Sequence, residues 1–186
     1  MGSRNINEDD EKFTENLVKK IIKKGYGIVS GGARGIDSVS SETALSNGGI
    51  VIEYLSDSLL SKIKKRNTIE ALREKKLVLL SASKPDARFN VGMAMGRNKY
   101  IYSQSDFTVV IKAENKKGGS WSGAIEALKK EYCPVFCRNN LQSEGNIELI
   151  SNGAISITEN WNIELKENNV KKTENVISSK KQLNLF

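Results

Sequence analysis

Histidine is absent from the 186 residues, and the chain has only two cysteines, Cys133 and Cys137. Without histidine, neither a Ser-His-Asp triad nor a Cys-His pair can be formed. A zinc site built from cysteine and histidine is excluded for the same reason, so we expect no metal, and no cofactor is implied. We expect two buried thiols in a cytoplasmic protein.

Long apolar runs and aromatic residues are also scarce. No run reaches the length of a membrane span, no signal peptide is visible, and aromatic residues make up 6% of the chain. Lys and Arg number 29 against 22 Asp and Glu, which gives a net charge of +7. The length suffices for one domain with a core. The basic charge suggests a polyanionic partner, and no membrane partner is expected.

The most informative stretch is residues 28–37, Ile-Val-Ser-Gly-Gly-Ala-Arg-Gly-Ile-Asp. An apolar run stops at Gly31 and Gly32, and a helical pattern begins after Arg34 and Gly35. A strand, a tight glycine loop and a helix start of this kind favour a bound anion, usually phosphate. The guanidinium of Arg34 is suited to pair with it. A tight turn without a ligand is the alternative.

Apolar runs alternate with helical patterns along most of the chain. We predict helices at 8–24, 36–46, 59–75, 91–104, 121–130 and 144–150, and strands at 27–30, 50–55, 77–81, 107–111, 135–137 and 154–158. This alternation predicts a Rossmann-like α/β fold with a mostly parallel sheet and helices on both faces. A second glycine loop, residues 116–120, also lies between a strand and a helix, so both loops meet at the carboxyl edge of the sheet.

The composition changes near residue 166, where Lys, Asn, Glu and Ser begin to dominate and almost nothing remains to be buried. We therefore divide the chain into a domain of residues 1–165 and a disordered tail of residues 166–186.

Several motifs, in this order, resemble the DprA/Smf family of DNA-processing proteins. They are Ser30–Asp37, Arg97–Tyr102 leading into Ser105–Val110, Gly118–Ala124, Gly145-Asn146 and Gly153-Ala154. The resemblance covers residues 2–157. It implies a Rossmann-like domain that binds single-stranded DNA, helps to load the RecA recombinase during natural transformation and works as a homodimer. It also implies that the protein is not an enzyme in the ordinary sense.

The family resemblance extends to the first residues of the chain. Gly2-Ser3-Arg4 matches a Gly-Ser/Thr-Arg motif that contributes to the anion pocket in the family, although a cloning scar is the alternative. The strand that precedes this motif in the family has no counterpart here, because of either a late start or an incomplete copy. In a doubly wound sheet that strand is central, so its neighbours would keep unpaired backbone groups.

Single-stranded DNA requires a basic groove for phosphates and often aromatic faces for bases. Together with the resemblance, this predicts a phosphate-binding set of Ser3, Arg4, Gly31, Gly32, Arg34, Gly35, Arg97, Asn98, Lys99, Gly118, Gly119 and Ser120. Asn98 has the alternative role of bracing the loops by hydrogen bonds. Tyr100, Tyr102 and Trp121 are candidates for stacking on bases, with burial in the core as the alternative for each.

Two positions depart from the family pattern. Ser41 stands where the family usually has histidine. Phe89 lies eight residues before Arg97, which alters the Phe-Pro-x-Arg-Asn spacing of the family. A role for Phe89 in the core therefore competes with a role in base stacking.

The last five residues, Gln182-Leu183-Asn184-Leu185-Phe186, resemble the bacterial sliding-clamp binding motif, Gln-Leu-Ser/Asp-Leu-Phe. The resemblance implies that Gln182 hydrogen-bonds at the rim of the clamp pocket, while Leu183, Leu185 and Phe186 fill it. A frayed apolar terminus is the alternative.

Two other functions stay open. Similar Rossmann-like domains include LOG-like nucleotide phosphoribohydrolases, the cytokinin-activating type, whose glycine loop precedes a glutamate. Glu126 follows Gly118 and Gly119 at nearly that distance, with Arg97 as a partner. The third function is a nucleotide-sensing module that binds DNA poorly.

Overall fold

The computed structural model describes residues 1–163. Its helices are α1 (Glu8–Lys23), α2 (Ile36–Ser46), α3 (Leu59–Lys62), α4 (Arg66–Arg73), α5 (Val91–Ser103), α6 (Gly118–Lys130) and α7 (Glu144–Ser151). Its strands are β1 (Ile28–Ser30), β2 (Val51–Leu55), β3 (Leu77–Ser81), β4 (Thr108–Val110), β5 (Val135–Arg138) and β6 (Ile155–Ile157). None of the helices in this part of the chain has the length and apolar character that a membrane span requires. The predicted tail, with its clamp-binding motif, lies outside the described residues.

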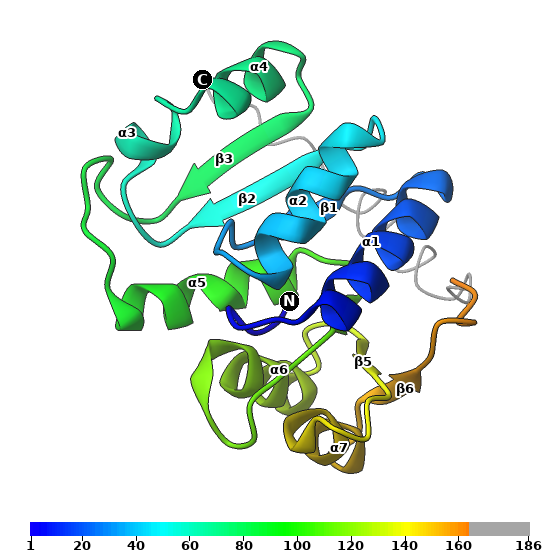
Figure 1. The fold of residues 1–186 in the computed structure, drawn as a ribbon. Coiled ribbons are helices and arrows are strands. Elements are labelled where there is room, and N and C mark those ends of the chain that lie inside the picture. The colour runs from blue at the N-terminus through cyan, green and yellow to red at the C-terminus, as the bar shows by residue number, and fades with distance from the viewer. Residues whose placement is uncertain (164–186) are drawn as a thin grey trace, which may run out of the picture.

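The strands form two three-stranded sheets, β1-β2-β3 and β4-β5-β6, in which every pair is parallel (Figure 1). From β1 the chain moves outward to β3, returns to β4 and then moves outward to β6. The α/β fold with parallel strands is confirmed. Within residues 1–163 no pairing joins β1 to β4, so the sheet is divided at the place where the sequence predicts a missing central strand.

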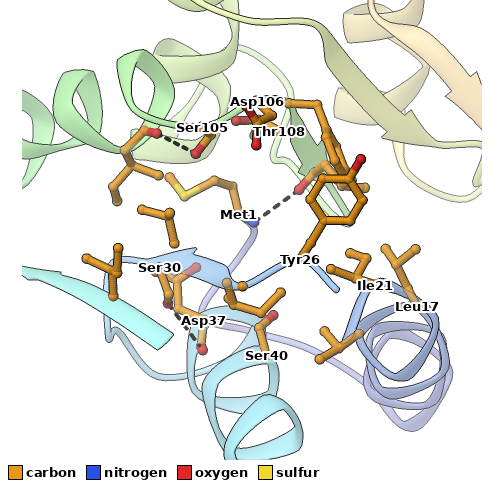
Figure 2. Close-up of a pocket in the computed structure, with 18 of the residues that line it drawn as sticks. Met1, Leu17, Ile21, Tyr26, Ser30, Asp37, Ser40, Ser105, Asp106 and Thr108 are labelled. Carbon is orange, nitrogen blue, oxygen red and sulfur yellow. Dashed lines mark hydrogen bonds between the residues drawn. The ribbon is translucent and has the colours of Figure 1, made fainter. Parts of the chain in front are cut away.

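A cavity of about 260 Å³ separates β1 from β4 (Figure 2). Met1 enters it from one end and pairs with the free edge of β4. The amino group of Met1 donates to the carbonyl of Val109 at 3.0 Å, and the N–H of Ile111 donates to the carbonyl of Met1 at 3.1 Å. The facing edges of β1 and β4 are the ones that the sequence predicts to lack a hydrogen-bonded partner strand.

Helix α1 packs against both halves of the molecule. It begins with a capping box, in which Asn7 Oδ1 accepts from the N–H of Asp10 and Asp10 Oδ2 accepts from the N–H of Asn7. The buried face of the helix carries Phe13, Leu17 and Ile21. These side chains share one apolar cluster with residues of α2, β5 and β6, so α1 bridges the two sheets.

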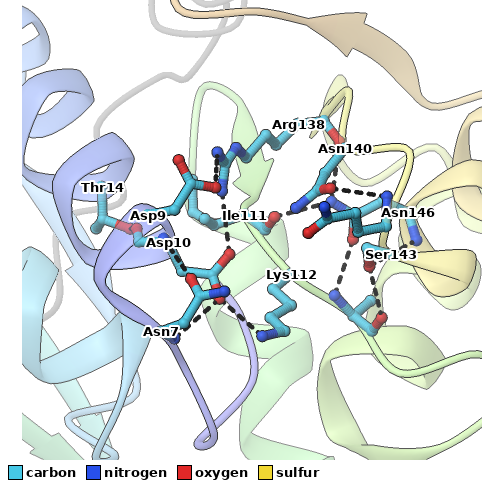
Figure 3. Close-up of polar contacts among 12 residues, drawn as sticks. Asn7, Asp9, Asp10, Thr14, Ile111, Lys112, Arg138, Asn140, Ser143 and Asn146 are labelled. Carbon is cyan, nitrogen blue, oxygen red and sulfur yellow. Dashed lines mark hydrogen bonds and ion pairs between the residues drawn. The ribbon is translucent and has the colours of Figure 1, made fainter.

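A buried polar network fixes α1 to the end of β5 (Figure 3). Arg138 donates through Nη1 to Asp10 at 3.0 Å and through Nη2 to Asp9 at 2.6 Å, while the ammonium of Lys112 donates to Asp10 at 2.7 Å. Asn146 of α7 is fully buried and donates to the carbonyls of Ile111 and Arg138. The network therefore connects α1, the segment directly after β4, β5 and α7.

Two predicted helices are wrong at their boundaries. The stretch 59–75 forms two helices, α3 and α4, separated at residues 63–65. Lys62, Lys65 and Arg66 stand three and four residues apart, where like charges disfavour a continuous helix. The helix predicted from residue 121 begins at Gly118, so the second glycine loop is largely the first turn of α6.

Candidate nucleic-acid interface

A pocket of about 350 Å³ opens beside the carboxyl ends of β1 and β4. The strand order reverses between these two strands, and open α/β sheets bind ligands at such a point. We call it the switch-point pocket. It is lined by Met1, Gly2, Ser3, Arg4, Asn5, Ala33, Asp37, Phe89, Val91, Ala94, Met95, Arg97, Asn98, Glu114, Lys117, Gly118, Gly119 and Ser120. It thus brings together seven of the predicted phosphate-binding residues, which are Ser3, Arg4, Arg97, Asn98, Gly118, Gly119 and Ser120.

The first turn of α6 supplies free backbone donors to this pocket. The N-cap residue, Lys117, makes no side-chain cap bond, and its own side chain is exposed. Asn98 is buried, and its Nδ2 donates to the carbonyl of Gly119 at 3.1 Å. This is the contact that the bracing role of Asn98 predicts. The uncapped N–H groups and the helix dipole together favour an anion here.

The first residues of the chain are packed into the fold beside the glycine loop. The N–H of Ser3 donates to the carbonyl of Lys112, and the carbonyl of Ser3 accepts from the N–H of Ile36. Gly35 has a φ of +83°, and a Cβ there would lie 2.4 Å from the Ser3 carbonyl oxygen. Glycine is therefore required where the loop enters α2. Gly2, Ser3 and Arg4 line the switch-point pocket, and their role in anion binding stays a prediction.

Arg97 lies beneath the glycine loop and is only 8% exposed. Its Nη1 donates to the carbonyl of Tyr54 at 2.6 Å. Burial lowers the pKa of Arg97, and the nearby carboxylate of Asp37 partly opposes that shift. A Cβ at Gly31 would lie 1.9 Å from Nη1, so the loop passes directly over the guanidinium. The Gly31 N–H donates to Asp37 Oδ2 at 3.2 Å, which holds the loop in place.

Phe89 forms part of the rim of the switch-point pocket. Its side chain is 46% exposed, and the guanidinium carbon of Arg4 lies 4.9 Å from the centre of its ring. The alternative of a core role for Phe89 is therefore wrong. A cationic group on an exposed aromatic face is an arrangement that can hold a nucleobase next to a phosphate.

Other predicted residues lie outside the pocket lining. Five of the predicted phosphate-binding residues do not line the switch-point pocket, namely Gly31, Gly32, Arg34, Gly35 and Lys99. Arg34 is exposed on the loop, and Lys99 forms an ion pair with Glu126 at 3.4 Å. Glu126 also pairs with Lys130, so its ion-pair partners in the described residues are lysines rather than Arg97.

The three aromatic candidates differ in exposure. Tyr102 is buried, with 1% exposed, and Trp121 is half-buried against the core, as the alternative of burial predicts. Tyr100 is 45% exposed and stacks on Tyr54 with 5.8 Å between ring centres, so the alternative of burial in the core is wrong for Tyr100.

Lys117 lines the pocket but is not among the residues predicted from the sequence. Its position directly before two glycines at a helix start is the signal that could have identified it.

The fold and this pocket define a doubly wound α/β protein of the Rossmann type. The family model described as DNA recombination-mediator protein A matches residues 1–166. The chain therefore belongs to this family.

Relatives of known sequence support the same assignment. The DNA processing protein DprA of Bacillus subtilis is 27% identical over 179 residues, which cover 94% of this chain and 60% of that protein. Protein Smf of Escherichia coli is 28% identical over 163 residues, which cover 86% of this chain and 44% of that protein. The chain thus spans 44–60% of the length of these two relatives.

Solved structures of the family share the fold. DprA from Streptococcus pneumoniae has a TM-score of 0.73 and 26% identity, covering 84% of this chain and 56% of that one. DNA processing protein A from Helicobacter pylori has a TM-score of 0.69 and 28% identity, covering 95% of this chain and 79% of that one. The latter structure concerns the binding of single-stranded DNA by that protein.

Proposed function

We propose that this protein binds single-stranded DNA at the switch-point pocket. The observation that carries the proposal is the convergence of Arg4, Lys117 and the uncapped N-terminus of α6 on one pocket at the carboxyl ends of β1 and β4. Phosphates would contact Arg4, Lys117 and the N–H groups of α6. Family membership and the DNA-binding relative from Helicobacter pylori support the same partner.

Bases would stack at the pocket rim. Phe89 is the exposed aromatic residue there, and Arg4 already lies against its face. Stacking on such a ring tolerates any base, because every base has an aromatic face. The buried guanidinium of Arg97 would contribute positive potential and support the loop from below.

A salt series with a labelled oligothymidine tests the proposal. Arg4→Ala and Lys117→Ala should each weaken binding and lower the slope of log Kd against log salt by about 0.7. Phe89→Ala should weaken binding without changing the slope, because it removes stacking rather than charge. The matched control is Arg66→Ala, since this arginine is 88% exposed on α4 and does not line the pocket. Binding that is unchanged in all three pocket variants would refute this site.

As in the family, we infer that the bound strand is passed to RecA. Wild-type protein should accelerate RecA assembly on single-stranded DNA that is already covered by a single-strand-binding protein. Arg4→Ala should lose the acceleration in proportion to its loss of DNA affinity. If the wild type and Arg4→Ala accelerate RecA assembly equally, the effect on RecA does not depend on the switch-point pocket.

We further infer a homodimer and a contact with the sliding clamp. Sedimentation equilibrium tests the dimer. For the clamp, the motif Gln182, Leu183, Leu185 and Phe186 supports the inference, and it lies outside the described residues. A peptide of residues 175–186 should compete with a known clamp-binding peptide, and replacing Leu185 and Phe186 by alanine should abolish competition. Equal competition by both peptides would refute the contact.

A further inference from the structure

The segment after β6, orange in Figure 1, forms a groove with α1. The ammonium of Lys20 donates to the backbone carbonyl of Glu159 and joins the two sides. Two adjoining pockets of about 380 and 400 Å³ make up the groove, and both are in the size range of small-ligand sites. They share Lys20, Lys23, Asn160 and Trp161, and none of the described residues of this α1 groove lines the switch-point pocket.

Trp161 lines both pockets of the α1 groove and is held from the core side. Its indole ring packs on Phe136 of β5 with 4.7 Å between ring centres, and it meets Phe107 edge to face at 6.0 Å. The ring is half-buried, so part of it stays open to the groove. Because the ring is already fixed, a planar ligand that stacks on it orders little further side-chain freedom.

The larger pocket favours an anion. Its lining includes Lys20, Lys23 and Lys24, and none of the lining residues within 1–163 is a carboxylate. Lys23 and Lys24 are exposed and have no ion-pair partner in the described part of the chain. The dipole of α1 places about half a negative charge at this end, which three lysines outweigh. A phosphate group would therefore be attracted to this pocket.

The smaller pocket favours a planar group with polar edges. Phe13 and Leu17 of α1 supply apolar surface beside the indole ring of Trp161. Exposed amide, hydroxyl and carboxylate groups come from Asn16, Thr158, Glu159 and Asn160. A nucleobase has apolar faces, and its edges carry hydrogen-bond donors and acceptors, so it suits such a lining. The carboxylate of Glu159 would accept from a base that carries an amino group.

We propose that the α1 groove binds a nucleoside phosphate, with the base against Trp161 and the phosphate among Lys20, Lys23 and Lys24. The proposal rests on a fixed indole ring that lies between an apolar pocket and a pocket with three lysines. A free nucleotide and the phosphorylated 5′ end of a single strand share this chemistry. The groove is separate from the switch-point pocket, so the proposal does not depend on the function proposed for that pocket.

The fluorescence of Trp161 tests the proposal on the complete chain. The protein has two tryptophans, so Trp121→Phe leaves Trp161 as the single reporter. Titration with dGMP should quench this fluorescence and saturate below about 1 mM, because the base stacks on the indole ring. Deoxyguanosine lacks the phosphate and should bind about tenfold more weakly. If Trp121→Phe does not fold, isothermal titration calorimetry of the wild type with dGMP makes the same measurement.

Charge variants place the binding in the groove. Lys23→Ala combined with Lys24→Ala should weaken dGMP binding about tenfold, because it removes two exposed cations from the larger pocket. The matched control combines Lys64→Ala with Lys65→Ala, which removes the same charge from an exposed segment outside the groove. The control should bind dGMP like the wild type, and so should Arg4→Ala in the switch-point pocket.

A tetranucleotide with a 5′-phosphate, measured in the Arg4→Ala background, distinguishes the two sources of the ligand. Tighter binding than that of dGMP assigns the groove to the end of a strand, and equal binding assigns it to the free nucleotide. Absence of binding for both probes at about 1 mM would overturn the proposal. So would dGMP binding that Arg4→Ala abolishes and the double lysine variant leaves unchanged, because the nucleotide would then occupy the switch-point pocket.

Discussion

Asp10 and Arg138 form a buried ion pair in which Oδ1 of the carboxylate lies 3.0 Å from Nη1 of the guanidinium. The side chains are 1% and 8% exposed. The two residues are 128 positions apart in the chain and join α1 to β5 across the molecule. Because both charges are away from water, removing one leaves the other poorly solvated.

We predict that Asp10→Ala lowers the free energy of unfolding by about 3 kcal/mol. The loss stays near the lower end of the range for buried pairs, because Asp9 remains bound to Arg138. The matched control is Glu15→Ala, which removes an exposed pair with Lys19 and should cost less than about 0.5 kcal/mol. Urea unfolding measures both variants, and equal losses would contradict a buried network that stabilises the fold.

The contact between Gly31 and Arg97 gives a second prediction. A methyl group at Gly31 would lie 1.9 Å from Nη1, so Gly31→Ala must displace the guanidinium from the Tyr54 carbonyl. We expect a loss of about 1–3 kcal/mol in unfolding free energy together with weaker DNA binding.

Gly96→Ala is the control for that substitution. Gly96 lies within α5, and nothing stands within 4 Å of its added Cβ. Alanine should therefore stabilise the helix by up to about 1 kcal/mol and leave DNA binding unchanged. Thermal unfolding and oligonucleotide binding of the two variants check both statements. If Gly31→Ala has wild-type stability, the glycine loop accommodates the added methyl group without cost, which would contradict the prediction.

Local patterns were sufficient for much of the fold. The helix at 36–46 and the strand at 77–81 have the predicted bounds. The helix lies between Gly35 and the Asn47-Gly48-Gly49 stop, and the strand is an apolar run that begins after Lys75 and Lys76. The glycine loop was also predicted, since positive φ at a strand-to-helix turn favours glycine. Parallel pairing followed from the alternation of strands and helices.

Contacts between distant residues account for what could not be predicted. The burial of Arg97 under the loop depends on Tyr54, which is 43 residues away. The exposure of Phe89 depends on how the segment before α5 meets Arg4. Neither contact has a local signal in the sequence. The division of the sheet into two halves was indicated only by the family pattern, because the apolar runs of β1 and β4 look like those of paired strands.

The two thiols should differ in reactivity. Cys137 is fully buried, and burial raises its pKa to about 12. Cys133 is half-buried beside Thr108, and burial raises its pKa to a smaller extent. Since the thiolate is the reactive form, a disulfide reagent at pH 8 should modify Cys133 slowly and Cys137 only after unfolding.

Counting modified thiols in native and urea-unfolded protein checks this difference. Wild-type protein should give one reactive thiol when folded and two when unfolded. Cys133→Ser should give none when folded. Rapid modification of Cys137 in folded Cys133→Ser would contradict the burial of this thiol on β5.

The amino group of Met1 should make stability depend on pH near neutrality. Burial lowers its pKa from the ordinary value of 8.0, and the carboxylate of Asp37 opposes that shift only in part. The chain has no histidine, and burial raises the pKa of both thiols, so these groups do not titrate between pH 6 and 8. A pH effect in this range that disappears when Met1 is acetylated therefore reports on Met1.

The sign follows from proton uptake. As the pH falls below 8.0, the unfolded chain binds a proton at Met1 that the folded chain does not yet bind. The free energy of unfolding should consequently decrease on acidification, by at most about 1.4 kcal/mol per pH unit, until the lowered pKa is reached. Urea unfolding at several pH values measures this slope. Acetylation of Met1 removes the titration but keeps an N–H for Val109, so the acetylated protein should show no slope between pH 6 and 8. The same slope in both proteins would assign the effect to another group.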